Sequence, residues 1–177
     1  MEPTSPVGLA LDQGPLSSFT RLAARYLREY REKIELGLSR LDEEQLWWRP
    51  RLEANSIGNL VLHLEGNLSL WILSAVGGLP YERDRRAEFE ADGMPGKQEL
   101  LRRLKVVVAR CIEILDDLGN TTLSTHLEVQ GYETNILGAI FHATEHTSYH
   151  TGQILYLVKV QLPDDATFEL YPQHRSE

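Results

Sequence analysis

Hydrophobic residues recur at helical spacing in four long segments of the chain. Within each segment, steps of three and four residues keep the apolar side chains on one face. The segments cover residues 17–40, 56–76, 97–118 and 134–160. The second ends at Gly-Gly-Leu-Pro, a sequence typical of helix ends. Helices of similar length that each carry one apolar face bury it most simply against one another, so the pattern predicts an all-α fold, a four-helix bundle.

The segments between these helices are longer than a simple up-and-down bundle requires. Asp42 and Gln45 have the spacing of a capping box, which predicts one short helical turn after the first helix. Residues 77–96 form a link rich in Gly, Pro and charge, and the alternation in "HLEVQGYE" around a Gln-Gly turn predicts a short hairpin before the last helix. Such long connections can cross over a bundle, and they often cover a functional site.

Length and composition indicate one soluble globular domain over residues 1–177, with short tails at 1–15 and 163–177. Apolar residues make up 42% and charged residues 25% of the chain, which is ordinary for such a domain. The single cysteine, Cys111, lies in an apolar helical run. We therefore expect it to be a small core residue, and no intrachain disulfide marks the chain as secreted.

The net charge of −8 argues against a nucleic-acid-binding surface, which needs clustered Lys and Arg. The densest basic stretch, "ERDRRAEFE", is interrupted by acids and predicts a solvated loop, in which Arg83, Arg85 or Arg86 could meet an anionic substrate. The chain begins without the pattern of a signal peptide, and no run approaches the ~18 apolar residues of a membrane span. We expect a cytoplasmic protein without a membrane partner.

Three of the six histidines, His142, His146 and His150, follow one another at a spacing of four in the last predicted helix. Imidazoles four residues apart lie on one helix face and can bind one metal ion together. His142 and His150, however, lie about 12 Å apart along the axis, too far to share an ion. The helix therefore supplies either His142 with His146 or His146 with His150, and a third ligand must come from elsewhere.

The face that carries these histidines continues into apolar residues at Ile154 and Leu157, so we expect it to point into the bundle. His63 interrupts a second apolar face, midway along the second helix, and is the candidate partner. His126 and His174 lie in a loop and in the polar tail, where exposure to solvent is expected. A lone histidine on an apolar face is usually a core residue with a hydrogen-bond partner, so the residues alone leave a structural role open.

Three sequence stretches, in order, resemble the DinB/YfiT-like superfamily of four-helix proteins. They are "LWWRP", "NSIGNLVLHLEGNLSLW" and "HATEHTSYHTGQI". The resemblance implies a bundle with crossover connections, a homodimer, and a metal triad of His63, His146 and His150, with His142 as a neighbour. One departure is Thr151, which stands where many relatives carry a basic residue after the last ligand.

Three histidines leave open positions on a divalent ion, which favours catalysis over a closed structural site. Zinc and nickel both suit imidazole ligands. The resemblance implies a metal-dependent enzyme, a thiol S-transferase or hydrolase that activates a thiol or water and takes a small-molecule substrate, with a low-molecular-weight thiol as co-substrate. The alternative is a non-catalytic, metal-binding stress-response bundle. A helical interaction module with structural histidines is a third reading.

Further polar and aromatic residues are candidates for supporting roles. Three polar residues lie one turn from a predicted ligand: Asn59, Asn67 and Gln153. We expect at least one to hold an imidazole N–H or a metal-bound water; the alternative is that they only satisfy contacts between helices. Glu145 is rotated about 100° from its neighbour His146, which makes it a weaker general base. Aromatic residues in the connections could form a pocket wall: Trp47, Trp48 and Tyr132.

Overall fold

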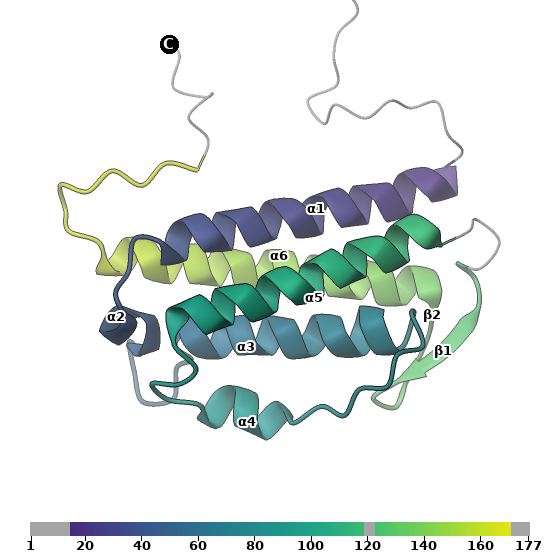
Figure 1. The fold of residues 1–177 in the computed structure, drawn as a ribbon, viewed down its shortest axis with the longest axis horizontal. Coiled ribbons are helices and arrows are strands. Elements are labelled where there is room, and N and C mark those ends of the chain that lie inside the picture. Colours follow the sequence, from purple (N-terminus) through teal and green to yellow (C-terminus); the bar gives the residue numbers. More distant parts are fainter. Residues whose placement is uncertain (1–14, 119–122, 171–177) are drawn as a thin grey trace, which may run out of the picture.

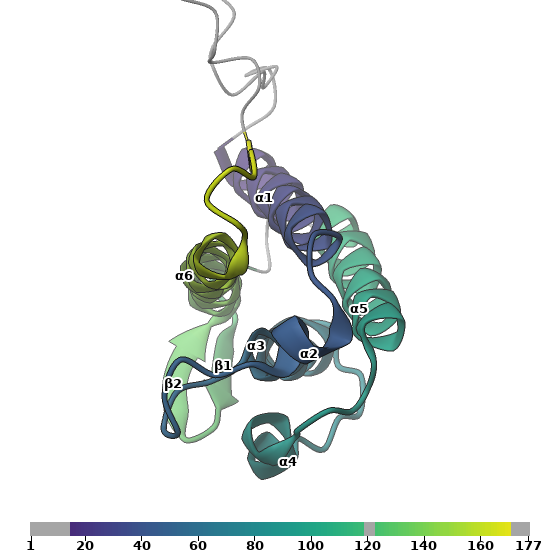
Figure 2. The same cartoon turned by 90° about the vertical axis from the view of Figure 1, so that its left-hand side faces the viewer.

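The computed structural model describes residues 15–118 and 123–170, which form an all-α four-helix bundle (Figure 1). The long helices are α1 (Pro15–Leu38), α3 (Ile57–Leu68), α5 (Lys97–Asp117) and α6 (Ile136–Gln161), and α3 continues into η1 (Ser69–Ser74). Helix α1 packs on α5 and α6, and α3 packs on the same two helices from the opposite side (Figure 2). The predicted fold is confirmed.

The apolar faces of the four helices meet in one core. Its largest fully buried side chains come from every long helix and include Leu27, Ile34, Leu64, Leu104 and Ile140. Cys111 is also fully buried, as expected of a core residue. Among the described residues, no helix is both long and apolar enough to cross a membrane.

Two predicted short elements are present. Helix α2 (Glu43–Trp47) begins at the expected capping box, in which the Asp42 carboxylate accepts from the Gln45 N–H at 2.8 Å and the Gln45 side chain accepts from the Asp42 N–H at 3.0 Å. Strands β1 (His126–Val129) and β2 (Tyr132–Asn135) form an antiparallel hairpin that leads directly into α6. The turn between them places Gln130 and Gly131 at positive φ, where glycine is favoured.

The solvated loop predicted for "ERDRRAEFE" is wrong, because residues 85–90 form helix α4 (Arg85–Glu90), which lies along α3 (Figure 1). The Asp84 carboxylate caps it by accepting from the Ala87 N–H at 2.9 Å. The Asn59 side-chain amide of α3 donates to the carbonyls of Glu88 at 3.1 Å and Ala91 at 2.8 Å. A six-residue helix rich in charge carries no periodic apolar signal, so its position depends on these tertiary hydrogen bonds.

The second long helix changes its hydrogen-bonding pattern near its end. In η1 the bonds span five residues, as in those from the Ala75 N–H to the Leu70 carbonyl and from the Gly77 N–H to the Ile72 carbonyl, both 2.9 Å. Such π-helical turns are rare and recur at functional sites. Trp71 lies within this segment, and its position relative to His63 therefore differs from that on a regular α-helix.

Candidate metal centre

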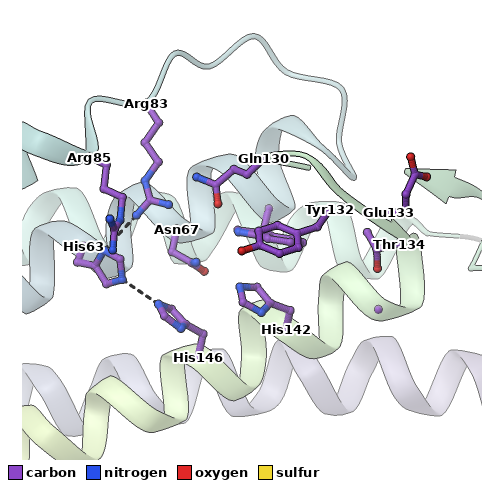
Figure 3. Close-up of a pocket in the computed structure, with 12 residues that line it drawn as sticks. His63, Asn67, Arg83, Arg85, Gln130, Tyr132, Glu133, Thr134, His142 and His146 are labelled. Carbon is purple, nitrogen blue, oxygen red and sulfur yellow. Dashed lines mark hydrogen bonds between the residues drawn. The ribbon is translucent and has the colours of Figure 1, made fainter. Parts of the chain in front are cut away.

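His63 on α3 and His146 and His150 on α6 face one another across the interface of the two helices. One ring nitrogen from each of the three lies within 4.8 Å of the other two. The Nε2 atoms of His63 and His146 are 2.9 Å apart (Figure 3), and the His146 and His150 ring centroids are 4.4 Å apart. The structure thus brings together the three residues named from the sequence, and we refer to them as the histidine cluster.

His63 is oriented by a carboxylate from α4. Its Nδ1 lies 2.9 Å from Oε2 of Glu88, and both side chains are buried. Arg83 binds the same carboxylate through two nitrogens, at 2.6 Å to Oε1 and 2.8 Å to Oε2. Arg83 Nη2, a donor, also lies 3.1 Å from Nδ1, but the shorter contact is with the ionised carboxylate, which only accepts. We therefore assign the proton of His63 to Nδ1, so that the Nε2 lone pair faces the cluster.

The ionised state of Glu88 results from opposing effects. Burial raises the pKa of this carboxyl, but hydrogen bonds from His63 and Arg83 and the Arg83 charge outweigh burial and hold the pKa below its usual range. Glu88 therefore stays negative at neutral pH. A carboxylate that holds the far nitrogen of an imidazole is a common support of metal-binding histidines.

Gly66 makes room for this carboxylate. A Cβ at position 66 would lie 2.0 Å from Glu88 Oε1 and 3.1 Å from Arg83 Nε, both closer than van der Waals contact allows. Glycine inside a helix is destabilising unless packing requires it, and here the close approach of Glu88 and Arg83 supplies that requirement. A glycine inside the predicted helix was therefore the signal in the sequence that another side chain packs closely against α3 at this position.

His150 is oriented in the same manner from its own helix. Its Nδ1 lies 2.7 Å from Oε1 of Gln153, an acceptor, so Nδ1 carries the proton and Nε2 is left for the cluster. Burial lowers the pKa of His150, and the Gln153 hydrogen bond only partly opposes that effect. Of the three polar residues predicted to support a ligand, Gln153 is the one that lies against an imidazole nitrogen.

His146 lies against both other members, with ring centroids 5.0 Å from His63 and 4.4 Å from His150. Burial, followed by the neighbouring His150, His63 and His142, lowers the pKa of His146 to about 3. The ring is therefore neutral at physiological pH, which is the protonation state that binds metal. Since His63 presents a lone pair at Nε2, the short contact between the two rings places the proton of His146 on its own Nε2.

His142 stands one turn from the cluster and makes different contacts. Its ring stacks on His146 with centroids 5.4 Å apart and lies 4.1 Å from the Trp71 ring. Burial lowers its pKa, so it too is neutral at pH 7. It forms no hydrogen bond with any residue in the described parts of the chain. Its place beside the cluster agrees with the neighbour role that the resemblance implied.

The two asparagines of α3 have separate roles. Asn59 touches no histidine, and its amide instead fastens α4, the helix that carries Glu88. Asn67 is 3% exposed, and its Oδ1 is buried without a hydrogen-bond partner among the described residues. The same holds for Nε1 of Trp71, one turn further along. Buried polar atoms are usually paired, so these two require an explanation.

A cavity of about 700 Å³ opens beside the cluster, and both Asn67 and Trp71 line it. Helices α3 and α6, the α4 segment and the hairpin all contribute to its walls (Figure 3). The lining residues are His63, Asn67, Trp71, Arg83, Arg85, Gln130, Tyr132, Glu133, Thr134, Gly138, His142 and His146. The unpaired atoms of Asn67 and Trp71 thus belong to residues that face a space large enough for a small molecule.

Other residues singled out in the sequence lie as follows. Tyr132 lines the cavity, whereas Trp47 is buried in the core and Trp48 is half exposed elsewhere. Thr151 is buried, with its hydroxyl donating to the Thr147 carbonyl at 2.7 Å. Exposed His126 pairs with Glu133 at 2.8 Å, as expected of a surface residue. His174 lies outside the described residues.

The donor set fits a divalent metal ion. Glu88 and Gln153 direct two Nε2 atoms inward, the third ring is neutral, and the nitrogens are close to the separation that ligands of one ion adopt. With three protein ligands, at least one position is left for an exogenous molecule. Sequence reasoning missed Glu88, which no spacing rule connects to a histidine 25 residues earlier.

Known proteins share this architecture. A family model described as "Protein of unknown function (DUF1572)" matches residues 16–170. The solved structure of a DinB-like protein from Bacillus cereus superposes with a TM-score of 0.64 at 16% identity, covering 85% of this chain and 95% of that one. A DinB-like protein from Bacillus subtilis gives a TM-score of 0.62 at 17% identity, covering 83% of this chain and 96% of that one. A conserved protein from Enterococcus faecalis gives 0.66 at 20% identity, covering 80% and 95%. No curated protein matches the sequence. The fold is therefore DinB-like.

Proposed function

The chain belongs to the DUF1572 family, and we propose that it is a metal-dependent enzyme with a divalent ion on His63, His146 and His150. One observation carries the proposal: His63 and His146 of the cluster line a cavity of about 700 Å³, and among the described residues no fourth metal-binding side chain joins the three histidines. A structural zinc site is normally closed by four protein ligands. Zinc and nickel both suit this donor set.

The proposed activity is the activation of a thiol or a water molecule, in a thiol S-transferase or a hydrolase. When bound, the ion would lower the pKa of that nucleophile and polarise an electrophile. His142 supplies a neutral imidazole on the cavity wall that accepts the nucleophile's proton. Asn67, another residue of the cavity wall, helps to position the nucleophile or the substrate. Glu88 and Gln153 keep two ligand rings in place throughout.

Elemental analysis of the natively purified protein tests the metal site. We expect close to one divalent ion per chain, and none in His63→Ala or His150→Ala. The matched control is His126→Ala, which removes an exposed histidine on the hairpin. If the wild type carries no stoichiometric metal and the two cluster variants change neither metal content nor melting temperature, the proposal is wrong.

Catalysis is tested separately by a thiol-conjugation and ester-hydrolysis screen, with and without the metal. The non-catalytic alternative predicts that EDTA lowers the melting temperature while no substrate is turned over. The proposed enzyme predicts turnover that disappears with EDTA and returns with added zinc or nickel.

We also propose a homodimer, which the DinB/YfiT-like resemblance implied. Two aromatic side chains on α6 are largely exposed, Phe141 with 61% and Tyr156 with 69% of its surface accessible. They support a surface on this helix that a second copy of the chain covers. Size-exclusion chromatography with light scattering would give twice the 20.2 kDa of one chain.

A further inference from the structure

Three arginines, 83, 85 and 86, lie in or next to α4, and they differ in their partners. Arg83 is bound to Glu88, and exposed Arg86 pairs with Glu90 at 2.6 Å. Arg85 forms no ion pair within residues 15–118 and 123–170, and its guanidinium lies 5.1 Å from the Phe89 ring centroid. Of the two arginines that line the cavity, Arg85 is therefore the one whose charge is not offset by a bound carboxylate.

The cavity lining is less negative than the protein as a whole. The chain has a net charge of −8, so an anion approaching most of its surface is repelled. The cavity lining contains Arg83, Arg85 and a single acid, Glu133, which pairs with exposed His126. Since Glu88 offsets Arg83, Arg85 is the cation of the wall that has no carboxylate partner within the described residues, and Glu133 is the one acid beside it.

Further hydrogen-bonding groups stand in the same cavity. Trp71 is 5% exposed, and its indole N–H, which can only donate, has no acceptor in the described parts of the chain. Asn67 presents an equally unpaired amide oxygen. Figure 3 shows Arg85 near His63 and Asn67 between that end and Tyr132. A ligand there meets the Arg85 cation and the side chains of Asn67 and Trp71 beside the histidine cluster.

We infer that this cavity binds a small organic carboxylate, with Arg85 as the residue that recognises the carboxylate group. A guanidinium matches a carboxylate with two parallel N–H donors. The same molecule packs against Asn67 and Trp71, which line the cavity, and its thiol or carbonyl end reaches the cluster. The inference rests on the proposed function in one respect: the thiol or carbonyl end of the ligand meets a metal ion bound to the histidine cluster.

The cobalt-loaded protein tests the inference with ω-mercapto acids of two to six carbons, each compared with the mercapto alcohol of the same length. Thiolate binding to cobalt adds a near-ultraviolet charge-transfer band, which gives a dissociation constant for each compound. For at least one length we expect the acid to bind about tenfold more tightly than the alcohol, the size of a charge-assisted hydrogen bond. Arg85→Gln should reduce this preference to near unity.

The matched control is Arg86→Gln, which alters the adjacent arginine outside the cavity and should keep the preference. A preference that survives in Arg85→Gln would come from chelation of cobalt by the carboxylate, and it would overturn the inference. Equal binding of acid and alcohol at every length would overturn it as well. Competition by inorganic phosphate as effective as that by acetate would show that the site selects charge and not a carboxylate.

A second measurement does not need the metal. In the metal-free protein, the indole N–H resonance of Trp71 can be assigned by its loss in Trp71→Phe. We expect hexanoate to shift that resonance and hexanol to leave it unchanged, with the shift absent in Arg85→Gln. If the protein does not bind cobalt but hexanoate still shifts the Trp71 resonance, only the proposed metal site is wrong. If hexanoate causes no shift in the folded wild-type protein, the carboxylate site is wrong.

Discussion

The two sides of the histidine cluster use their polar atoms in opposite ways. On one side, Glu88 of α4 and Gln153 of α6 each form a hydrogen bond with an imidazole of the cluster. Arg83 binds the Glu88 carboxylate, and Asn59 binds the Glu88 backbone carbonyl. On the cavity side, the polar atoms of four lining residues have no hydrogen-bonding or ionic partner within the described residues: Asn67, Trp71, Arg85 and His142. The paired side fixes the geometry of the cluster, and the unpaired side is available to a ligand.

The largest effect should come from the unpaired side. His142→Gln keeps a polar side chain of similar size but removes the neutral base, so we expect the rate of metal-dependent turnover to fall by about 10² to 10⁴. Metal content should stay near that of the wild type, because His142 is not one of the proposed ligands. Steady-state kinetics together with elemental analysis checks this, and a variant that loses metal in step with activity would contradict the distinction between the two sides.

On the paired side, Glu88→Gln should weaken metal binding. The amide can still accept from His63 Nδ1 but carries no charge, and loss of such a support typically lowers metal affinity 10- to 100-fold. Competition with a chromophoric chelator measures the affinity. Glu90→Gln, which changes an exposed carboxylate on the same short helix, is the matched control and should bind metal normally. Equal affinity in both variants would show that Glu88 does not support the site.

A smaller effect is expected when the carboxylate is displaced and not altered. Gly66→Ala places a methyl group where Glu88 Oε1 lies, so the hydrogen bond to His63 should lengthen and metal affinity should fall by about tenfold or less. Gly152→Ala on α6 is the control, because a Cβ there meets no atom within 4 Å. That control should instead gain about 0.5 to 1 kcal/mol of stability, the usual gain for alanine over glycine in a helix. Similar metal affinities for the two variants would contradict the close packing at Gly66.

A prediction of another kind concerns the metal-free protein and pH. The pKa of His146 is about 3 in the folded state, below the ordinary value of 6.5, and burial also lowers those of His142 and His150. The unfolded chain therefore binds more protons in this range, so the free energy of unfolding should be fully retained above pH 6.5 and decline as the pH falls towards 3. Urea denaturation in EDTA at several pH values measures this. His146→Gln should flatten the decline, and an unchanged slope would contradict the assignment.

The four helices, the capping box and the hairpin could be predicted because each is encoded locally. Periodic apolar residues specify a helix over a long segment, and Asp42 and Gln45 interact across one turn. The meeting of His63 with His146 could be inferred only from the resemblance, because helix geometry limits which residues of one helix share an ion and does not name the third. That the three rings lie together is a property of the structure, and their binding of metal stays a prediction.

Helix α4 and the π-helical turns could not be predicted for physical reasons. Six residues give too few turns for a periodic signal, and the buried residue of α4 is a glutamate, which a pattern of apolar positions assigns to solvent. Its position depends on Asn59, Arg83 and His63, which are brought together by tertiary structure. The five-residue hydrogen bonds of η1 leave no trace in residue spacing, so the sequence predicted one uninterrupted helix over residues 56–76.

The π-helical segment gives the cavity wall a means of evolving independently of the metal centre. Residues 69–74 hold one residue more per hydrogen-bonded turn than a regular helix, and they begin after His63, Gly66 and Asn67 have been placed. Loss of a single residue in this segment would restore α-helical bonding, and the residues on either side would keep their orientation, because a π-helical turn accommodates one extra residue. Length variation in this segment would therefore change the side chains of the aromatic wall at Trp71, while the histidines and their supporting carboxylate keep their places.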